Sequence, residues 1–211
     1  MDLTKSAYIF GAGEFFGLRE LPDENAVVIA ADGGLRYADA CGLDVDFTVG
    51  DFDSLGYVPN GKNVSVLPVQ KDTTDLYEAV RIGAAQGCTR FHLYGGTGGR
   101  FDHTVANLSL LGGMAKERLR GFLYGDGYVV TTVFPENPLI LNGEKGAGVS
   151  VFSLSDRSEG VTLRGLLYPL ENGTLTNTFP LGVSNQKTEE TAEISVKSGI
   201  LLVYYTYPRK D

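Results

Sequence analysis

Aspartates and glycines recur in this sequence where apolar segments with a β-strand pattern end, and one of these positions also has an arginine. Four segments show the pattern: Ala31–Gly34, Gly50–Ser54, Lys71–Asp75 and Gly95–His103. Hard oxygen ligands suit a metal ion, exposed backbone amides suit phosphate, and a cation stabilises negative charge that develops in a reaction. The residue types therefore predict a site that holds a metal ion and phosphates.

Asp51 and Asp53 are two residues apart, and on a turning backbone this spacing can direct both carboxylates at one cation. The alternative is a solvated turn, because a lone pair of this kind is common without a metal. Asp32 is a candidate for the same acidic site, although it could also cap the following helix. Gly33 next to it would allow a ligand to approach the backbone, or simply permit a tight turn.

The segment Gly95–His103 has four glycines within five residues, followed by Arg100 and Asp102. The amides of Gly96, Thr97 and Gly98 are then accessible to a polyphosphate. Arg100 can donate two parallel hydrogen bonds to phosphate oxygens, and Asp102 can ligate a metal or orient Arg100. A flexible surface loop is the alternative interpretation.

Thr74 and Asp75 begin a segment with helical spacing, so either could serve as a helix cap rather than as a ligand. Lys71 could contact a phosphate, or it could be a solvated lysine. The segment Gly11–Gly17 follows a strand and has the spacing GxGxxxG, one residue longer than the dinucleotide fingerprint. A dehydrogenase would leave the other clusters unexplained, and the chain has no GxxxxGK[ST] phosphate loop.

Strand and helix signals alternate in the first part of the chain, which predicts a mainly parallel, Rossmann-like three-layer α/β domain over residues 1–133. Predicted strands cover Ala7–Phe10, Ala26–Ala31, Phe47–Val49, Val64–Val69 and Phe91–Tyr94, and predicted helices cover Thr74–Gln86 and His103–Leu119. In such sheets, ligands bind at the carboxyl ends of the strands, where the clusters fall.

Beyond Pro135 we find no amphipathic helix, and short β-rich runs dominate. We expect an all-β sandwich or barrel over residues 134–211. Predicted strands are Val149–Leu154, Val161–Leu163, Thr174–Thr178, Ala192–Val196 and Ile200–Tyr207. We expect turns between strands at Asn142-Gly143, Asn172-Gly173 and Ser198-Gly199.

The composition is that of a globular protein, with 43% hydrophobic and 21% charged residues. The net charge of -8 argues against a nucleic-acid or anionic-membrane surface and suits a cationic small molecule. No run is long enough to span a membrane, and Cys41 and Cys88 lack the spacing of a metal or disulfide motif. We therefore expect no nucleic acid or membrane partner, and a cytoplasmic location.

At these same residues the sequence resembles the thiamine pyrophosphokinase family. The motifs ADGG, GDFDS, KDTTD and GGTGGRFDHTVANLSLL follow the order and approximate spacing of that family. In the second part, Gly165–Leu170 and Gly182–Asn185 are similar to its GLxYPL and SN segments. The resemblance covers nearly the whole chain.

The resemblance implies an enzyme that transfers the pyrophosphoryl group of ATP to thiamine, giving thiamine diphosphate and AMP. It implies that Asp51, Asp53 and Asp75 surround Mg²⁺, with Asp32 in the same acidic cluster. Catalytic roles are implied for Asp51, Asp53, Asp75, Arg100 and Asp102, and contacts with the nucleotide or its phosphates for Thr74, Arg100 and Asp102. Ser184 and Asn185 would contribute to a thiamine pocket at the interface of a homodimer with composite active sites.

Two other functions remain open from the residues. A metal-dependent phosphoesterase could use the same aspartates to hydrolyse phosphate esters without an alcohol acceptor. A nucleotide- or carbohydrate-binding module could use the glycine-rich loop, although the many carboxylates argue against it. The residues leave open which aspartate accepts the hydroxyl proton.

Overall fold

The structure is a computed structural model that describes residues 4–53, 55–61, 63–68, 70 and 72–207. It is mostly β, with a large mixed sheet and few helices. Two compact units divide the chain: the first is Met1–Leu110 with Leu119–Asp126, and the second is Leu111–Arg118 with Gly127–Asp211.

The strands of the first unit all pair in parallel. In the order in which they pair, they are β6 (Arg120–Gly125), β5 (Arg90–Tyr94), β1 (Ser6–Phe10), β2 (Val27–Ala31), β3 (Phe47–Gly50) and β4 (Val64–Val66). Every residue of β1 and β2 is buried, as expected for parallel strands covered on both faces. The parallel pairing predicted for this part is therefore confirmed; position 69 of the expected fourth strand lies outside the described residues.

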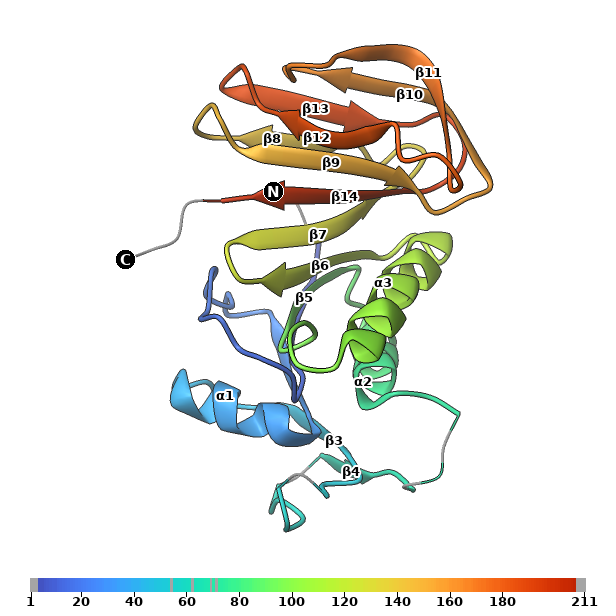
Figure 1. Cartoon of the computed structure of the whole chain (residues 1–211). Helices are drawn as coiled ribbons and strands as arrows, with labels where there is room; N and C mark the ends of the chain where they lie inside the picture. Colours follow the sequence, from blue (N-terminus) through green and yellow to red (C-terminus); the bar gives the residue numbers. More distant parts are fainter. Residues whose placement is uncertain (1–3, 54, 62, 69, 71, 208–211) are drawn as a thin grey trace. The chain divides into compact units, whose positions relative to one another are not determined.

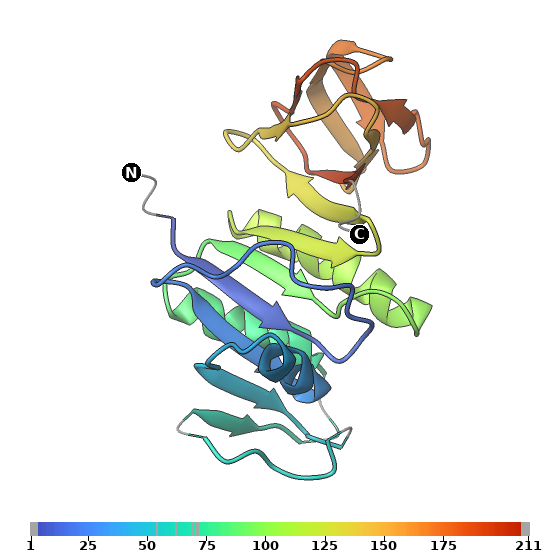
Figure 2. The same cartoon turned by 90° about the vertical axis from the view of Figure 1, so that its left-hand side faces the viewer.

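Two helices, α1 (Leu35–Ala40) and α2 (Asp75–Ala85), lie on opposite faces of these strands (Figures 1 and 2). α2 buries Leu76, Ala79, Val80 and Gly83, the residues whose spacing predicts it. A Cβ atom at Gly83 would lie 2.8 Å from the Phe91 ring, so a glycine is needed for this helix to pack against the strands. The third helix, α3, covers Phe101–Lys116, and a short 3₁₀ turn covers Asp32–Gly34.

The second unit has strands but no α-helix between residues 127 and 207, all of which the structure describes. β12 (Gly182–Gln186), β9 (Gly148–Ser153), β14 (Leu201–Thr206) and β7 (Tyr128–Val133) pair antiparallel in that order. A separate four-stranded sheet contains β11 (Leu170–Thr176), β10 (Arg157–Arg164), β13 (Thr191–Ser195) and β8 (Leu139–Asn142). The five predicted strands correspond to β9, β10, β11, β13 and β14.

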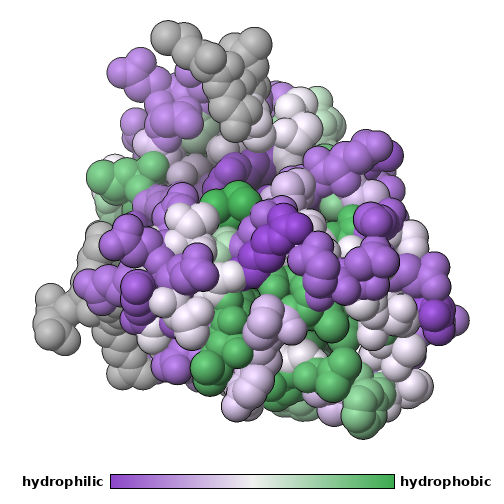
Figure 3. Space-filling view, turned by 90° about the horizontal axis from the view of Figure 1, so that it is seen from above, coloured by the Kyte–Doolittle hydropathy of each residue, from purple (hydrophilic) through white to green (hydrophobic). Residues whose placement is uncertain are grey.

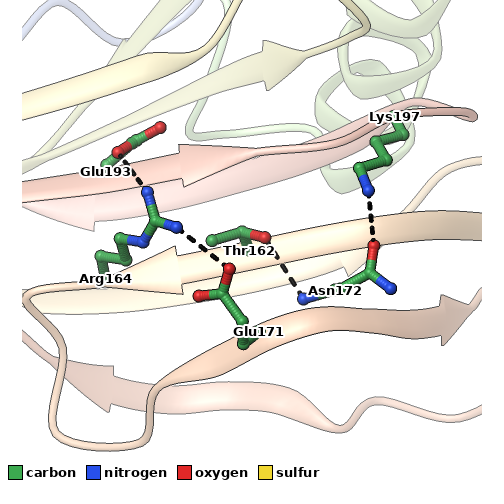
Figure 4. Close-up of polar contacts among 6 residues, drawn as sticks. All are labelled: Thr162, Arg164, Glu171, Asn172, Glu193 and Lys197. Atoms are coloured by element: carbon green, nitrogen blue, oxygen red, sulfur yellow. Dashed lines mark hydrogen bonds and ion pairs between the residues drawn. The ribbon is translucent and has the colours of Figure 1, made fainter.

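One predicted turn is wrong. Asn172 and Gly173 lie inside β11, where Asn172 has a φ of 51° and the pairing with β10 shifts in register. The Asn172 amide donates to Thr162 Oγ1 at 3.3 Å, and its side chain accepts from Lys197 (Figure 4). The sequence signal therefore marks a bulge in the strand rather than a hairpin turn.

Ion pairs join neighbouring strands on the solvated face of the four-stranded sheet. Arg164 on β10 contacts Glu171 on β11 at 3.0 Å and Glu193 on β13 at 3.5 Å (Figure 4). Glu193 is the residue opposite Arg164 in the β10–β13 register. Such exposed cross-strand pairs contribute modestly to stability and help to fix register.

Large hydrophobic side chains are also exposed on the second unit. They include Leu154, Leu167, Tyr168, Phe179, Leu181 and Val183, of which Tyr168 and Phe179 are each 64% exposed. Figure 3 shows one face of the molecule, on which hydrophobic and hydrophilic residues are mixed. Among the described residues, no helix is long and apolar enough to cross a membrane.

Candidate active site

A cavity of about 690 Å³ lies at the carboxyl ends of the strands of the first unit. Its walls are residues 11–14 after β1, 31–32 after β2, Asp51 and Asp53 after β3, and 95–100 after β5. Residues 73–76, at the start of α2, complete the acidic side. The edge that the fold class predicts for a ligand site therefore carries the cavity.

The acidic side of the cavity contains a cluster of three carboxylates. One oxygen each from Asp32, Asp51 and Asp75 lies within 4.8 Å of the other two. Asp32 is buried, whereas Asp51 and Asp75 are partly exposed to the cavity. Three convergent oxygen donors are the type of ligand set that Mg²⁺ prefers.

Glycines make the approach of Asp32 to Asp51 possible. A Cβ atom at Gly50 would lie 3.1 Å from three atoms of Asp32, so a larger residue before Asp51 would push Asp32 away by a few tenths of an ångström. A Cβ atom at Gly34 would lie 1.9 Å from the carbonyl oxygen of Phe10. The glycines of ADGG and GDFDS therefore set the backbone spacing that brings the carboxylates together.

Asp53 lines the same cavity but is not part of the three-carboxylate cluster. Its amide donates to Asp51 Oδ1 at 3.3 Å, so this turn helps to orient Asp51. Phe52, between the two aspartates, is buried, with a φ of 59°. This buried ring anchors the turn that directs both neighbours to the cavity.

A second side of the cavity, the glycine side, is rich in glycine. Two segments, residues 11–14 and 95–99, run side by side: Gly13 N donates to Gly95 O at 2.8 Å and Glu14 N donates to Thr97 O at 3.0 Å. A Cβ atom at Gly95 would lie 2.2 Å from Gly11 O, so the close crossing requires glycine. The segment Gly11–Glu14 thus belongs to the same cavity as the glycine-rich loop.

Arg100 forms a bidentate ion pair with Asp102, in which Arg100 Nε lies 3.2 Å from Asp102 Oδ1. Both side chains are exposed. The hydrogen bonds to Arg100 lower the pKa of Asp102, and the same pair raises the pKa of Arg100. Arg100 lines the cavity, whereas Asp102, its partner in the ion pair, does not.

The residues at the start of α2 both cap this helix and line the cavity. Thr74 is the N-cap, and its hydroxyl accepts from Tyr77 N at 3.2 Å. Thr74 and Asp75 both line the cavity. The capping interpretation is therefore confirmed for Thr74, and it leaves the Asp75 carboxylate in the first turn directed toward Asp32 and Asp51.

Buried polar groups support the inner part of the glycine-rich loop. Asn107 Nδ2 on α3 donates to Gly96 O at 2.7 Å, and Thr97 Oγ1 donates to the carbonyl of Tyr124 at 3.3 Å. The Tyr124 hydroxyl lies 2.8 Å from His92 Nδ1. Burial, followed by the charge of Arg90, lowers the pKa of His92 to about 4, so its 3.8 Å approach to Glu20 is not an ion pair at neutral pH.

Most of the predicted site residues of the first part line this one cavity. These are Asp32, Asp51, Asp53, Thr74, Asp75, Gly96, Thr97, Gly98 and Arg100. Gly33 is buried in the 3₁₀ turn next to Asp32 and does not line the cavity. Lys71 lies outside the described residues.

Ser184 and Asn185 belong to the second unit, where the two family-like segments lie beside each other. Leu167 N donates to Gln186 O at 2.9 Å. The buried Asn185 side chain accepts from Tyr168 N at 3.0 Å and donates to Tyr168 O at 2.8 Å. Ser184 is exposed, with a φ of 60°. Asn185 therefore holds the backbone that presents the exposed Leu167 and Tyr168.

Sequence reasoning gave no role in the site to several residues that line the cavity, among them Glu14, Tyr37 and Asn107. Tyr37 donates from its hydroxyl to Gly13 O at 2.9 Å. The glycines after β1 are a signal for Glu14, but they also fit a dinucleotide fingerprint. Asn107 and Tyr37 lie within helical segments, where their types and spacing do not separate a site residue from a packing residue.

Comparison with known proteins gives consistent matches over both units. Residues 18–123 match the family described as thiamin pyrophosphokinase, catalytic domain, and residues 138–201 match thiamin pyrophosphokinase, vitamin B1 binding domain. The chain is 28% identical over 188 residues to the thiamine pyrophosphokinase of Bacillus subtilis strain 168, covering 86% of this chain and 87% of that relative.

Solved structures agree in fold. The chain is similar to the thiamine pyrophosphokinase of Bacillus subtilis, with a TM-score of 0.85 and 24% identity over 96% of this chain and 99% of that one. For the thiamin pyrophosphokinase from Geobacillus thermodenitrificans the TM-score is 0.81 and the identity 25%, over 96% of this chain and 98% of that one. For the thiamin pyrophosphokinase from Candida albicans the TM-score is 0.72 and the identity 14%, over 97% of this chain and 90% of that one.

A carboxylate cluster and a glycine-rich backbone that line one cavity are typical of transferases that act on phosphoryl groups. The two family matches together cover most of the chain on either side of residues 124–137. The chain belongs to the thiamine pyrophosphokinase family.

Proposed function

We propose that this enzyme transfers the pyrophosphoryl group of ATP to the hydroxyethyl oxygen of thiamine, giving thiamine diphosphate and AMP. One observation carries the proposal within the family: the acidic cluster and the glycine-rich loop line one cavity at the strand ends. The acidic character of the site also favours a substrate that carries a thiazolium cation.

Mg²⁺ fits the donor set of the acidic side. Asp32, Asp51 and Asp75 would hold it, because their oxygens already converge and carboxylates are the ligands that this hard cation prefers. We retain Asp53 as a further ligand, since its carboxylate lines the same wall. When bound, the cation would neutralise charge on the polyphosphate oxygens.

The glycine side would bind the nucleotide. The glycine-rich loop contributes Gly96, Thr97 and Gly98 to the cavity wall, and Thr74 and Arg100 line the same cavity. Gly33, which is buried next to Asp32, is a further proposed contact. Asp102 would orient the guanidinium of Arg100 through its bidentate pair. Lys71, from the same motif as Thr74, is a proposed phosphate contact.

The reaction needs alignment more than a strong base. The thiamine hydroxyl oxygen forms a bond to the β-phosphorus, the bond between this phosphorus and the α–β bridging oxygen breaks, and AMP leaves with that oxygen. Arg100 stabilises the charge that develops on the phosphate oxygens. An aspartate of the cavity accepts the hydroxyl proton.

We further propose that residues 1–133 form a Rossmann-like, three-layer catalytic domain and residues 134–211 a thiamine-binding β-sandwich. Ser184 and Asn185 would contribute to the thiamine pocket at the interface of a homodimer. Exposed Leu167 and Tyr168, held next to Asn185, are apolar groups that suit such an interface. The proposed location is the cytoplasm, where ATP is available and where Cys41 and Cys88 remain thiols.

The reaction class is tested with purified protein, ATP, Mg²⁺ and thiamine. We expect AMP and thiamine diphosphate to appear in equal amounts and only when thiamine is present. Release of ADP, or of free phosphate without thiamine, would instead identify a simple kinase or a phosphoesterase. Omitting the protein and replacing ATP with AMP are the two controls.

The composite site is tested with differently tagged chains, one carrying Asp53→Asn and the other a damaging substitution at Asn185. Each variant alone should be inactive. If the site takes groups from two chains, a mixed dimer has one site with both lesions and one with neither. Random pairing should then return roughly a quarter of wild-type activity, because half of the dimers are mixed and half of their sites are intact. No recovery in proven mixed dimers would place each site within one chain.

A further inference from the structure

The glycine-rich loop has two parts that are held in different ways. Its inner part, Gly95–Thr97, is buried and is bound by Asn107 and by the backbone after β1. Its outer part, Gly98–Arg100, is exposed, and Gly98 and Gly99 have φ values of 79° and 57°. Two successive glycines in this region give the outer part wide conformational freedom.

Glu14 spans both parts of the loop. Its amide donates to Thr97 O at 3.0 Å, and its Oε1 accepts a hydrogen bond from Gly99 N at 2.8 Å. A Cβ atom at Gly98 would lie 2.6 Å from Glu14 Cδ, so the side chain lies directly against the Gly98 backbone. The Glu14 main chain thus binds the last residue of the inner part, and its carboxylate binds the middle residue of the outer part.

The position of Glu14 gives this contact a functional consequence. Glu14, Gly98, Gly99 and Arg100 all line the cavity. A hydrogen bond from an amide to a carboxylate is stronger than one between neutral groups. Holding the outer part in one shape before the nucleotide arrives removes an ordering cost that binding would otherwise have to meet.

We propose that Glu14 is a positioning residue for the nucleotide: its carboxylate holds the outer part of the glycine-rich loop, and with it Arg100, in the shape that receives the polyphosphate. This inference rests on the proposed use of ATP. Glu14 itself contacts no reacting atom and acts through the Gly99 amide. The essential property is the acceptor oxygen, so a neutral side chain of the same length can replace it.

The test compares Glu14→Ala, Glu14→Gln and Glu24→Ala. Glutamine keeps an acceptor oxygen at the same reach, alanine removes it, and Glu24 is an exposed glutamate that does not line the cavity. For Glu14→Ala we expect the KM for ATP to rise about tenfold, the loss expected for one charge-assisted hydrogen bond. Its kcat and its KM for thiamine should stay within about twofold, because bound nucleotide still orders the loop.

Hydrogen exchange of the unliganded protein gives a readout that does not depend on the reaction. Glu14→Ala should increase exchange at Gly99 and its neighbours by about tenfold, while Glu14→Gln and Glu24→Ala stay near wild type. Glu14→Gln should also keep its KM for ATP within about threefold of wild type.

Three results would overturn the inference. One is unchanged exchange at Gly99 in Glu14→Ala. Another is a glutamine variant as impaired as the alanine variant, which would make the charge essential. The third is tighter ATP binding in both variants, which would mean that Glu14 competes with the phosphates. If the wild type failed to use ATP and thiamine, the exchange measurement would still decide whether Glu14 orders the loop.

Discussion

The two sides of the cavity differ in what carries their function. The acidic side consists of side chains, with Asp32, Asp51 and Asp75 converging from different strands and a helix. The glycine side depends on the shape of its backbone, and its key distances are those between Gly11 and Gly95 and between the Glu14 carboxylate and the Gly99 amide. A change of charge without a change of shape should therefore damage the first side, and a change of shape without a change of charge should damage the second.

Neutralising an aspartate of the cluster should give the largest effect. We expect Asp51→Asn and Asp75→Asn to lower kcat by about two to three orders of magnitude, because each keeps the side-chain shape and removes a charge that would face Mg²⁺. Steady-state rates at several Mg²⁺ concentrations measure this, with unfolding curves to show that the fold is retained.

Asp53 and Asp44 provide the comparison for that result. Asp53→Asn should lose about two orders of magnitude, the lower end of that range, since Asp53 lines the cavity but its oxygens lie outside the cluster. The exposed Asp44 lies outside the cavity, so Asp44→Asn should retain wild-type rates. Near-normal turnover of Asp51→Asn at limiting Mg²⁺ would return the GDFDS segment to the interpretation of a solvated turn.

A methyl group at the close crossing should have the next largest effect. Gly95→Ala places a Cβ atom 2.2 Å from Gly11 O, at a φ of 65°. We expect the free energy of unfolding to fall by about 3 kcal/mol, from the strained backbone together with the overpacking. Urea unfolding followed by circular dichroism measures this loss.

Gly99 is the matched control for Gly95, because it shares a positive φ of 57° but has no atom within 4 Å of an added Cβ. Gly99→Ala should cost only about 1 kcal/mol, from backbone strain alone. Equal losses for the two variants would show that conformation, rather than the close approach of Gly11, makes glycine necessary on this side.

The sequence predicts much of the acidic side because its signals are local. Thr74 before Leu76 indicates where α2 begins, and the aspartates of GDFDS directly follow a strand. The convergence of Asp32 with Asp75 depends on strand order and on close packing at Gly34 and Gly50, which no local pattern specifies. The contact of Glu14 with Gly99 joins residues 85 positions apart, so neither segment predicts it by itself.

In the second unit, too, local sequence patterns predict only some of the elements. Alternating, half-buried strands such as β9 are predicted from their pattern. β12 is missed because it is short, mostly exposed and interrupted by Ser184 at a φ of 60°. Asn172-Gly173 is a strong turn signal, yet pairing with β10 incorporates it into a strand. Tertiary pairing overrides local preference at such positions.

Removing the support of the inner loop should have a smaller effect than Gly95→Ala. Asn107→Ala leaves the buried carbonyl of Gly96 without its 2.7 Å hydrogen bond, and we expect a loss of about 2 kcal/mol in unfolding free energy. Asn107→Asp keeps the shape but replaces the donor with a carboxylate facing that carbonyl. It should be at least as destabilising at neutral pH, and a stable aspartate variant would argue against this hydrogen bond.

The smallest expected effect is on the pH dependence of stability. It arises from His92, which lies beneath the inner part of the glycine-rich loop. His92 contacts Tyr124, whose carbonyl accepts from Thr97, and burial lowers the pKa of His92 to about 4 from an unfolded value of 6.5. Between these values the unfolded chain binds a proton that the folded protein does not. The free energy of unfolding therefore falls as the pH drops from about 6.5 towards 4.

His92→Gln removes this dependence, while His103→Gln removes the chain's other histidine, whose side chain is exposed, and serves as its control. Between pH 7.5 and 5.5, wild type should lose about 1 kcal/mol more than His92→Gln, and His103→Gln should follow wild type. Carboxylates that titrate in all three proteins cancel in this difference. If His92→Gln and wild type lost the same stability, His92 would contribute nothing to the pH dependence of the unfolding free energy. That dependence would then come from the acidic residues.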